Sequence, residues 1–421
     1  MMMSESKITS VEIMAPVGSY ESLMAAIQGG ADAVYFGVGE LNMRSRSARK
    51  FDMDDLHRIV GICRENGIKS YLTLNTIIYD EELDDMRRTV DEARVAGITA
   101  IIASDVSVMR YAREQGLRVH ISTQCNITNL EALRFYARYG DVMVLARELS
   151  LEQVYRIWQG INEEGIRGPH GELVRLEVFV HGALCMAVSG KCYLSLDNMN
   201  YSANRGACLQ LCRRSYLVTD REEGYELEVD HQYIMSPKDL CTIGFIDKIM
   251  KAGVSVFKIE GRGRSADYVK TVTSCYREAV AAVEEGSYSR EKVEGWTDRL
   301  KGVFNRGFWD GYYLGRKMGE WSERYGSQST RKKQYLGKVT NYFSRLQVAE
   351  IKLETRDLSL GDEIMVTGPT TGVVEHIVDQ VQVNHRETKR AHKGESCSVK
   401  LPGLVRRGDK VFHVRTEELM F

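Results

Sequence analysis

The sequence predicts an α/β fold, a (β/α)8 barrel of the TIM type, followed by a small C-terminal antiparallel β-barrel. Three observations lead to this prediction. Short apolar runs alternate with amphipathic helical patterns from residue 11 to residue 259, and such alternation requires a parallel sheet. Glycines follow several helical patterns, at Gly67, Gly97, Gly116 and Gly140, as expected for helix ends. Beyond residue 335 the pattern changes to short alternating strands with turn signals.

The barrel strands are predicted from apolar runs that helical patterns separate. The expected strands are residues 11–16, 33–36, 70–75, 100–104, 118–122, 141–146, 176–180 and 254–259, with 225–229 or 233–234 as a candidate for one more. The expected helices are residues 21–28, 54–64, 81–95, 108–115, 130–138, 151–159, 265–285 and 290–303. This number of repeats matches a (β/α)8 barrel. The alternative is a doubly wound open sheet, but no GxGxxG follows any strand.

The chain of 421 residues exceeds the usual size of one domain, so two domains are expected. We assign residues 1–304 to the barrel, including a cysteine loop at 181–214, and residues 305–333 to a linker. Residues 334–421 hold six short strand patterns and form the C-terminal domain. Its spacing and the run LGDEIMVTGP resemble the second domain of translation elongation factors, a likeness of fold only.

Composition narrows the function classes. The formal net charge of −1 gives no overall attraction to nucleic acid. Neither a signal-peptide pattern nor an apolar run of about 18 residues is found. We therefore expect a cytoplasmic protein that does not enter a membrane, in a compartment where thiols stay reduced.

Four cysteines lie within 28 residues, and we expect them to bind a metal. Cys185, Cys192, Cys208 and Cys212 are separated by six, fifteen and three residues. Structural zinc sites usually use closely spaced pairs, which only Cys208 and Cys212 form. An iron–sulfur cluster accepts thiolates from irregular loops. The spacing favours a cluster over zinc and leaves a site without metal as a third alternative.

Polar residues gather at the carboxyl ends of the predicted strands, where barrels place their active sites. On a strand, Lys258, Glu260 and Arg262 of the run KIEGR would share one face. Facing the barrel interior, they suit a carboxylate or phosphate ligand; facing the helices, they form a charged rim. His181 directly precedes the cysteine loop. The other candidates are Asn75, Asp105, Gln124, Arg147, Glu148, Lys238 and Asp239.

A basic stretch in the C-terminal domain is a candidate RNA contact. Residues 385–393, HRETKRAHK, together with Arg406 and Arg407, could hold a phosphate backbone. The alternative is a solvated loop that binds no RNA. Tyr335, Tyr342 and Phe343 are available for base stacking or for the core.

Several motifs carry a family resemblance over residues 11–285. They include MAPVGSYESLMAAIQGGADAVYFG, EVFVHGALCMAVSGKC, GACLQLCRR and SVFKIEGRGRSADYV. On these motifs the chain is identified as a member of the family called peptidase U32. The combination of RELSLEQ, HGALC and SGKC is most similar to its branch of prephenate-dependent tRNA uridine hydroxylation proteins.

That resemblance implies hydroxylation of wobble uridine in tRNA to 5-hydroxyuridine, with prephenate as cosubstrate and oxygen that does not come from O2. It implies an iron–sulfur cluster, of the 4Fe–4S type, on Cys185, Cys192, Cys208 and Cys212. In other branches a cysteine elsewhere replaces the last ligand, which makes Cys241 the competing position. We further hypothesise that His181 or Glu260 moves protons, and that an electron or cluster donor is a partner. The expected ligands of the anionic cosubstrate are Arg147, Lys238, Lys258 and Arg262.

Three alternatives stay open. The family name points to a peptidase, although the chain has no HExxH and no GxSxG; a cysteine nucleophile paired with His181 would require only one thiol. Hydroxylation of cytidine in 23S rRNA is a second activity within the family. A non-enzymatic RNA-binding scaffold is the third. The segment between Arg214 and Met235 lacks the long insert of some members, which leaves the RNA contacts undefined.

Overall fold

The computed structural model describes residues 10–43, 50–185, 187–189, 191–199, 201–214, 216–219, 222, 226–229, 236–315, 320, 322 and 326–416. Its larger part is a closed barrel of parallel strands. Strand β11 pairs with β7 on one side and with β1 on the other, which closes the sheet. The barrel strands are β1 (Glu12–Pro16), β2 (Ala33–Phe36), β3 (Lys69–Leu74), β4 (Ala100–Ala103), β5 (Arg118–Ile121), β6 (Val142–Val144), β7 (Arg175–Gly182) and β11 (Val256–Ile259). The predicted (β/α)8 barrel is thus confirmed, and the open doubly wound sheet is not formed.

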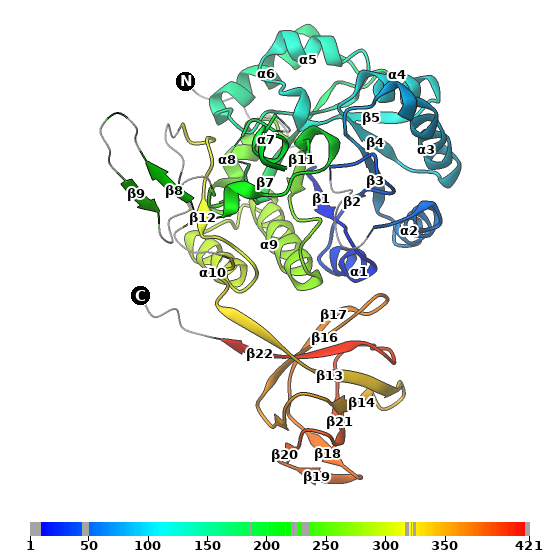
Figure 1. Ribbon diagram of the computed structural model, residues 1–421, viewed down its shortest axis with the longest axis vertical. Helices are drawn as coiled ribbons and strands as arrows, with labels where there is room; N and C mark the ends of the chain where they lie inside the picture. Colours follow the sequence, from blue (N-terminus) through cyan, green and yellow to red (C-terminus); the bar gives the residue numbers. More distant parts are fainter. Residues whose placement is uncertain are drawn as a thin grey trace.

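Helices surround the barrel (Figure 1). They are α1 (Tyr20–Gln28), α2 (Met53–Glu65), α3 (Leu83–Ala96), α4 (Val106–Glu114), α5 (Leu130–Tyr136), α6 (Leu151–Glu164), α8 (Ile246–Lys251) and α9 (Ala266–Glu284). Local chemistry sets their ends. Ser150 caps α6 in a capping box with Gln153, and α3 ends at Gly97, whose φ of 82° lies in the left-handed region that glycine tolerates. None of the helices in the described ranges has the length and apolar character required to cross a membrane.

Short strands extend the sheet beyond the barrel. β10 (Asp239–Cys241) runs antiparallel to the end of β7, and β12 (Phe308–Trp309) pairs with β10. A separate hairpin joins β8 (Tyr216–Thr219) to β9 (Glu226–Val229). The candidate strand at 225–229 is therefore a hairpin strand and not a barrel strand; the other candidate, 233–234, lies outside the described residues. The cysteine loop carries α7 (Leu194–Met199), and α10 (Arg290–Lys301) follows α9.

The C-terminal part is an antiparallel sheet with its own hydrophobic core. Its hydrogen-bonded order is β17-β16-β22-β13-β14-β21-β18-β19, and within the described residues no pairing joins the two end strands. The strands are β13 (Arg331–Phe343), β14 (Val348–Leu353), β16 (Glu363–Gly368), β17 (Gly372–Ile377), β18 (Val381–Val383), β19 (Arg386–Thr388), β21 (Ser396–Lys400) and β22 (Lys410–Thr416), with a small pair β15 (Leu358–Ser359) and β20 (Arg390–Ala391). β12 and the start of β13 fall within the stretch expected to be a linker.

The C-terminal sheet docks on α1 and α9 (Figure 1). The Gln28 side chain donates to the carbonyl of Thr371 at 2.8 Å and accepts from the amide of Val373 at 3.0 Å. Lys270 donates to the carbonyl of Val373 at 3.0 Å. Val373 and Val414 are buried in the same hydrophobic cluster as the helices of the barrel. The two parts therefore share polar and apolar contacts.

Candidate active site

A cavity of about 400 Å³ lies at the carboxyl ends of the barrel strands, with the cysteine loop as part of its wall. This size is typical of small-molecule sites, which span about 300–1,000 Å³. Among the described residues that line it, six are cationic and one is acidic. The cationic ones are Arg147, Arg213, Lys258, Arg262, Arg264 and Arg306, and the acidic one is Glu260.

Arg147 lines this cavity because it lies just after the carboxyl end of β6. It follows β6, its guanidinium carbon lies 3.8 Å from the centre of the Phe179 ring, and its Nη1 donates to the carbonyl of Ala183 at 3.1 Å. Its Nε is buried and has no hydrogen-bond partner among the described residues. A buried donor without a partner is costly, so the position is well suited to receive an anion.

Lys258 forms the floor of the cavity. Its ammonium group donates to Glu177 at 2.7 Å, and Glu177 is fully buried and also contacts His120 at 2.8 Å. Burial would raise the pKa of Glu177, but Lys258 and His120 outweigh it and lower that pKa to about 2. Glu177 thus stays charged and keeps Lys258 in place.

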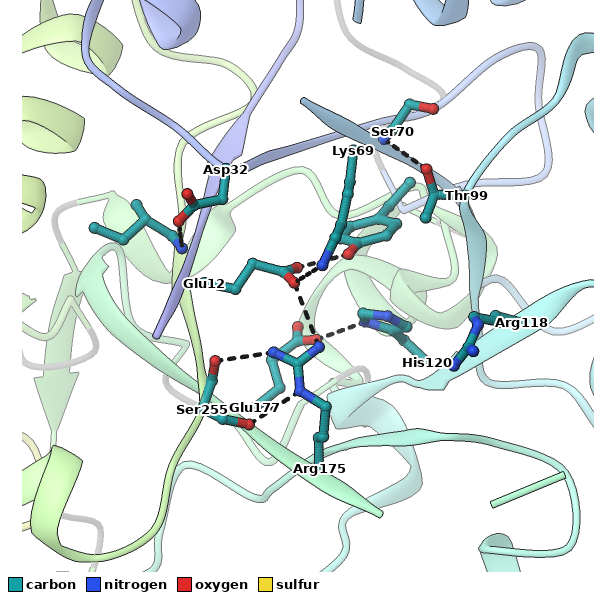
Figure 2. A network of polar contacts seen from close by, with 12 residues as sticks. Glu12, Asp32, Lys69, Ser70, Thr99, Arg118, His120, Arg175, Glu177 and Ser255 are labelled. Carbon is teal, nitrogen blue, oxygen red and sulfur yellow. Dashed lines mark hydrogen bonds and ion pairs between the residues drawn. The ribbon is translucent and has the colours of Figure 1, made fainter. Parts of the chain in front are cut away.

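Toward the amino ends of the barrel strands, next to Glu177, the barrel interior holds a polar network (Figure 2). Glu12 accepts from Lys69 at 2.6 Å and from the Tyr71 hydroxyl at 2.6 Å, and Arg175 lies 3.4 Å from the same carboxylate. The Tyr71 ring packs on His120, with ring centres 4.5 Å apart. These charged groups are paired with one another, so they support the floor of the cavity and do not compete for its ligand.

The run KIEGR lines the cavity, but by a different geometry from the one expected. β11 ends at Ile259, so Glu260 and Arg262 lie in the following loop and not on the strand. Arg262 donates from Nη1 to Thr73 Oγ1 at 2.8 Å, and the Tyr35 hydroxyl lies 3.3 Å from Glu260 Oε2. A loop turn therefore brings these two side chains to the same cavity as Lys258.

Close backbone packing holds this loop against its neighbours. A Cβ on Gly182 would lie 2.4 Å from the carbonyl oxygen of Glu260, and a Cβ on Gly18 would lie 1.9 Å from that of Arg262. Only glycine leaves room for these contacts. The glycines therefore fix where the Glu260 and Arg262 side chains emerge.

Three of the four predicted cysteines lie in the wall of the cavity. Cys185, Cys208 and Cys212 line it. Burial raises the pKa of Cys185 and of Cys212, and the nearby thiols, Cys192 included, raise both further. In the described part of the chain, no three cysteine, histidine or acidic side chains are grouped closely enough to hold a metal ion. The donor set still has the chemistry of an iron–sulfur site, because its four members are thiols whose charges act on one another, and Arg147 and Arg213 lower the pKa of Cys185 and Cys212 respectively.

A salt bridge anchors the cysteine loop to the barrel. Both terminal nitrogens of Arg205 donate to the Glu82 carboxylate at 2.5 Å, and Nη1 also donates to the carbonyl of Ile77 at 2.8 Å. The guanidinium carbon of Arg205 lies 4.0 Å from the centre of the Tyr79 ring. The loop after β3 thus holds the middle of the cysteine loop at the mouth of the barrel.

Several predicted site residues lie outside the cavity lining. His181 is buried against Tyr268, Tyr276 and Phe308, and burial and Arg264 lower its pKa to about 3. Lys238 pairs with Glu320 at 3.1 Å. Cys192 is not among the lining residues. Cys241 is not among the lining residues either. Burial raises its pKa to about 11, and its thiol interacts with Tyr276.

Sequence reasoning missed three of the six cations. Arg213 directly follows Cys212, and Arg264 lies two residues after Arg262, so neighbouring motifs carried a signal for both. Arg306 stood in the expected linker, where no pattern indicated a site. It reaches the cavity because β12, just after it, pairs with β10.

The basic stretch of the C-terminal sheet lies on its surface. Arg386 and Arg390 are exposed, on β19 and β20. Asp357 pairs with Arg390 at 2.7 Å and accepts from the amide of Lys393 at 2.7 Å, so part of the stretch is already neutralised. Tyr335 packs against Phe412, with ring centres 5.9 Å apart.

Comparisons with known proteins match this chain to one family. The model of peptidase family U32 matches residues 18–323. A protein from Porphyromonas gingivalis named collagenase is 57% identical over 411 residues, which cover 98% of this chain and 99% of that protein. The tRNA hydroxylation protein P1 of Bacillus subtilis is 32% identical, over 88% of this chain and 86% of that protein. The 23S rRNA 5-hydroxycytidine C2501 synthase of Escherichia coli is 32% identical, over 74% of this chain and 46% of that protein. The chain belongs to peptidase family U32.

Proposed function

We propose that the protein is an RNA-modifying enzyme that hydroxylates wobble uridine of tRNA to 5-hydroxyuridine, with prephenate as its anionic cosubstrate. The observation that carries this proposal is the charge of the cavity, six cationic side chains against one acidic. Carboxylate and phosphate ligands require such donors, whereas a peptide bond is neutral. Relatives named for tRNA and rRNA hydroxylation give further support.

The residues of the cavity have distinct roles in this proposal. Arg147, with its unpartnered Nε, and Arg262 bind a carboxylate of the cosubstrate. Lys258, held by Glu177 at 2.7 Å, adds positive charge at the floor of the cavity. Glu260 Oε2, next to the Tyr35 hydroxyl at 3.3 Å, accepts or returns a proton. The cysteine loop covers the ligand and excludes water.

The cysteine loop would hold the cofactor. Cys185, Cys192, Cys208 and Cys212 are the proposed ligands of an iron–sulfur cluster. Such a cluster would supply electron transfer or Lewis-acid chemistry beside the cavity. Arg147 and Arg213, which act on two of these thiols, would offset the negative charge of the ligated thiolates.

A peptidase is the second candidate, favoured by the name of the Porphyromonas relative. A cysteine peptidase requires a thiol of low pKa paired with a histidine. Here the pKa values of Cys185 and Cys212 are raised, and His181 packs against the rings of Tyr268 and Tyr276. These features argue against a cysteine peptidase.

Mass spectrometry of tRNA from a strain that lacks the gene tests the proposal. We expect wobble 5-hydroxyuridine and its derivatives to disappear, and the wild-type gene to restore them. Arg147→Gln should not restore them. Arg290→Gln should, because Arg290 is an exposed residue of α10 with 86% of its side chain accessible.

Other outcomes of that experiment would reassign the function. Unchanged tRNA with loss of 5-hydroxycytidine in 23S rRNA would transfer the activity to rRNA. Unchanged tRNA and rRNA would remove it. Hydrolysis of collagen or gelatin that survives chelation, but is lost in Cys185→Ser, would establish the peptidase.

The proposed ligand set predicts how iron content responds to substitution. After anaerobic purification, Cys212→Ser should lower iron and sulfide per chain severalfold, because one of four thiolates is lost. Cys241→Ser should keep them, because its thiol interacts with Tyr276 instead. The reverse result would make Cys241 the ligand, and a colourless wild-type protein with one zinc would exclude a cluster.

A further inference from the structure

Three arginines line the cavity without a role so far in binding the substrate. Arg213 comes from the cysteine loop, Arg264 from the loop after β11, and Arg306 from the segment after α10. These segments are far apart in sequence. Their side chains line the same cavity.

Arg264 and Arg306 share a neighbouring ring, and separate contacts hold Arg306 and Arg213 in place. The guanidinium carbons of Arg264 and Arg306 lie 3.6 Å and 5.1 Å from the centre of the same ring, Phe304. Arg306 pairs with the buried Asp239 at 3.2 Å. Arg213 donates to Ser236 Oγ at 2.8 Å and to the carbonyl of Leu184 at 3.1 Å.

Arg264 differs from the other two. Among the described residues its side chain contacts the rings of Phe304 and Tyr268 and has no carboxylate or other hydrogen-bond acceptor. A half-buried guanidinium group has five N–H donors to satisfy. Its donors are therefore available to a ligand.

The cluster also carries more positive charge than its surroundings offset. Burial lowers the pKa of Arg264, and the charge of Arg306 acts in the same direction. Asp239 and Glu260 are the carboxylates that oppose these effects on Arg264. Three cations beside two carboxylates still leave a net positive charge at low dielectric, so a bound anion would stabilise the arrangement.

We propose that Arg213, Arg264 and Arg306 form a second anion subsite, separate from Arg147, Lys258 and Arg262, and that it takes a phosphate group of the RNA substrate. Three guanidinium groups from separate segments offer more N–H donors than the two coplanar oxygens of a carboxylate can accept, and they suit the larger set of phosphate oxygens. A phosphate bound there would fix the nucleotide whose base enters the cavity. The identity of the RNA rests on the proposed function, whereas the phosphate subsite does not.

Inorganic phosphate tests the subsite without RNA. Thermal unfolding is measured in phosphate and in chloride at equal ionic strength. Phosphate should raise the Tm of the wild-type protein, because a ligand of the folded state stabilises it. Arg264→Gln should lose more than half of that rise, and it leaves no buried partner unpaired. Arg290→Gln, on the exposed face of α10, should keep it.

Two results would contradict a separate phosphate subsite. An equal phosphate response in Arg264→Gln and wild type would exclude the subsite. An equal loss in Arg147→Gln would show a single anion site in place of two. Should Arg264→Gln fail to fold, Arg264→Lys keeps one charge without the planar fork and carries the same comparison.

Binding of labelled tRNA, measured by fluorescence anisotropy over a range of salt concentrations, tests the RNA assignment. Arg264→Gln should weaken binding and reduce the slope of log K against log salt by about one, as expected for one lost phosphate contact. An unchanged slope would contradict the assignment to RNA phosphate. Absence of tRNA binding by the wild type, with a retained phosphate response, would remove the proposed function and leave the subsite.

Discussion

At the residue scale, burial decides the role of His181 more than its position beside the cysteine loop does. Its side chain is 1% exposed, and its Nδ1 lies 3.4 Å from the Tyr276 hydroxyl. Three aromatic rings surround it. A neutral imidazole in this position packs β7 against α9. In the proposed reaction, Glu260 is therefore the candidate for proton transfer.

This burial predicts a pH dependence of stability. The folded-state pKa of His181 is about 3 against an ordinary value of 6.5, so between these values the unfolded chain binds a proton that the folded chain does not. Stability should therefore fall as the pH is lowered from 6.5, by roughly 2 kcal/mol down to pH 5 from this residue. In His181→Phe, which keeps the aromatic packing, urea unfolding should show a correspondingly weaker dependence. Identical slopes for the two proteins would contradict the buried neutral state.

At the element scale, the cysteine loop depends on a small number of contacts with the barrel. The pair of Arg205 with Glu82 is three-quarters buried, with 26% and 22% of the side chains exposed. Its hydrogen bonds lower the pKa of Glu82. Because this pair joins the cysteine loop to the segment after β3, it holds one side of the cysteine loop at the mouth of the barrel.

Removal of this anchor should loosen the loop without unfolding the barrel. Arg205→Gln is expected to cost about 1–2 kcal/mol of local stability, more than an exposed ion pair does. Hydrogen exchange should then accelerate at residues 201–214 while the barrel strands stay protected. Glu82→Gln should have a similar effect, and the double variant should be no worse than either single one.

Arg88→Gln provides the matched control, because it removes an exposed pair with Asp85 on α3, 74% and 62% accessible. Faster exchange throughout the barrel in Arg205→Gln would show that the pair stabilises the fold as a whole.

At the scale of the whole molecule, the C-terminal sheet is coupled to the wall of the cavity. Lys333 of β13 pairs with Asp267 in the first turn of α9. This helix begins directly after the loop that carries Arg262 and Arg264. RNA bound to the sheet would therefore act on the same helix that positions two of the cavity cations.

Gln28 is the side chain that most directly tests this docking, since it serves two backbone groups of the sheet. Gln28→Ala leaves the Thr371 carbonyl and the Val373 amide without partners, at a cost of about 1–3 kcal/mol each if they stay buried. Calorimetry should then resolve separate transitions for barrel and sheet. Gln115→Ala, at the end of α4, should leave unfolding unchanged. A single cooperative transition in Gln28→Ala would show that apolar contacts suffice.

Most of the fold could be read from local patterns, because the signals that make each element are local. β1 and β4 are buried along their whole length and so read as short apolar runs. α3 and α6 carry their end signals in Gly97 and Ser150. The two-residue strand β12 and the three-residue strand β10 show no period, and they form only because the end of β7 offers an open edge.

Local sequence patterns likewise predicted one part of the candidate site and not the other. The cysteine spacing and the run KIEGR marked six lining residues, Cys185, Cys208, Cys212, Lys258, Glu260 and Arg262, and the strand ends marked Asn75, Gln124 and Arg147. These predictions succeeded because loops after parallel strands converge at one end of a barrel. Sequence alone could not show that Glu177, 81 residues before Lys258, fixes that ammonium group. It could not show that His181 is buried, or that Arg306 joins Arg213 and Arg264. Secondary-structure propensity and hydrophobic periodicity depend on residues close together in the sequence. Charge pairing and burial depend on contacts that only the closed barrel creates.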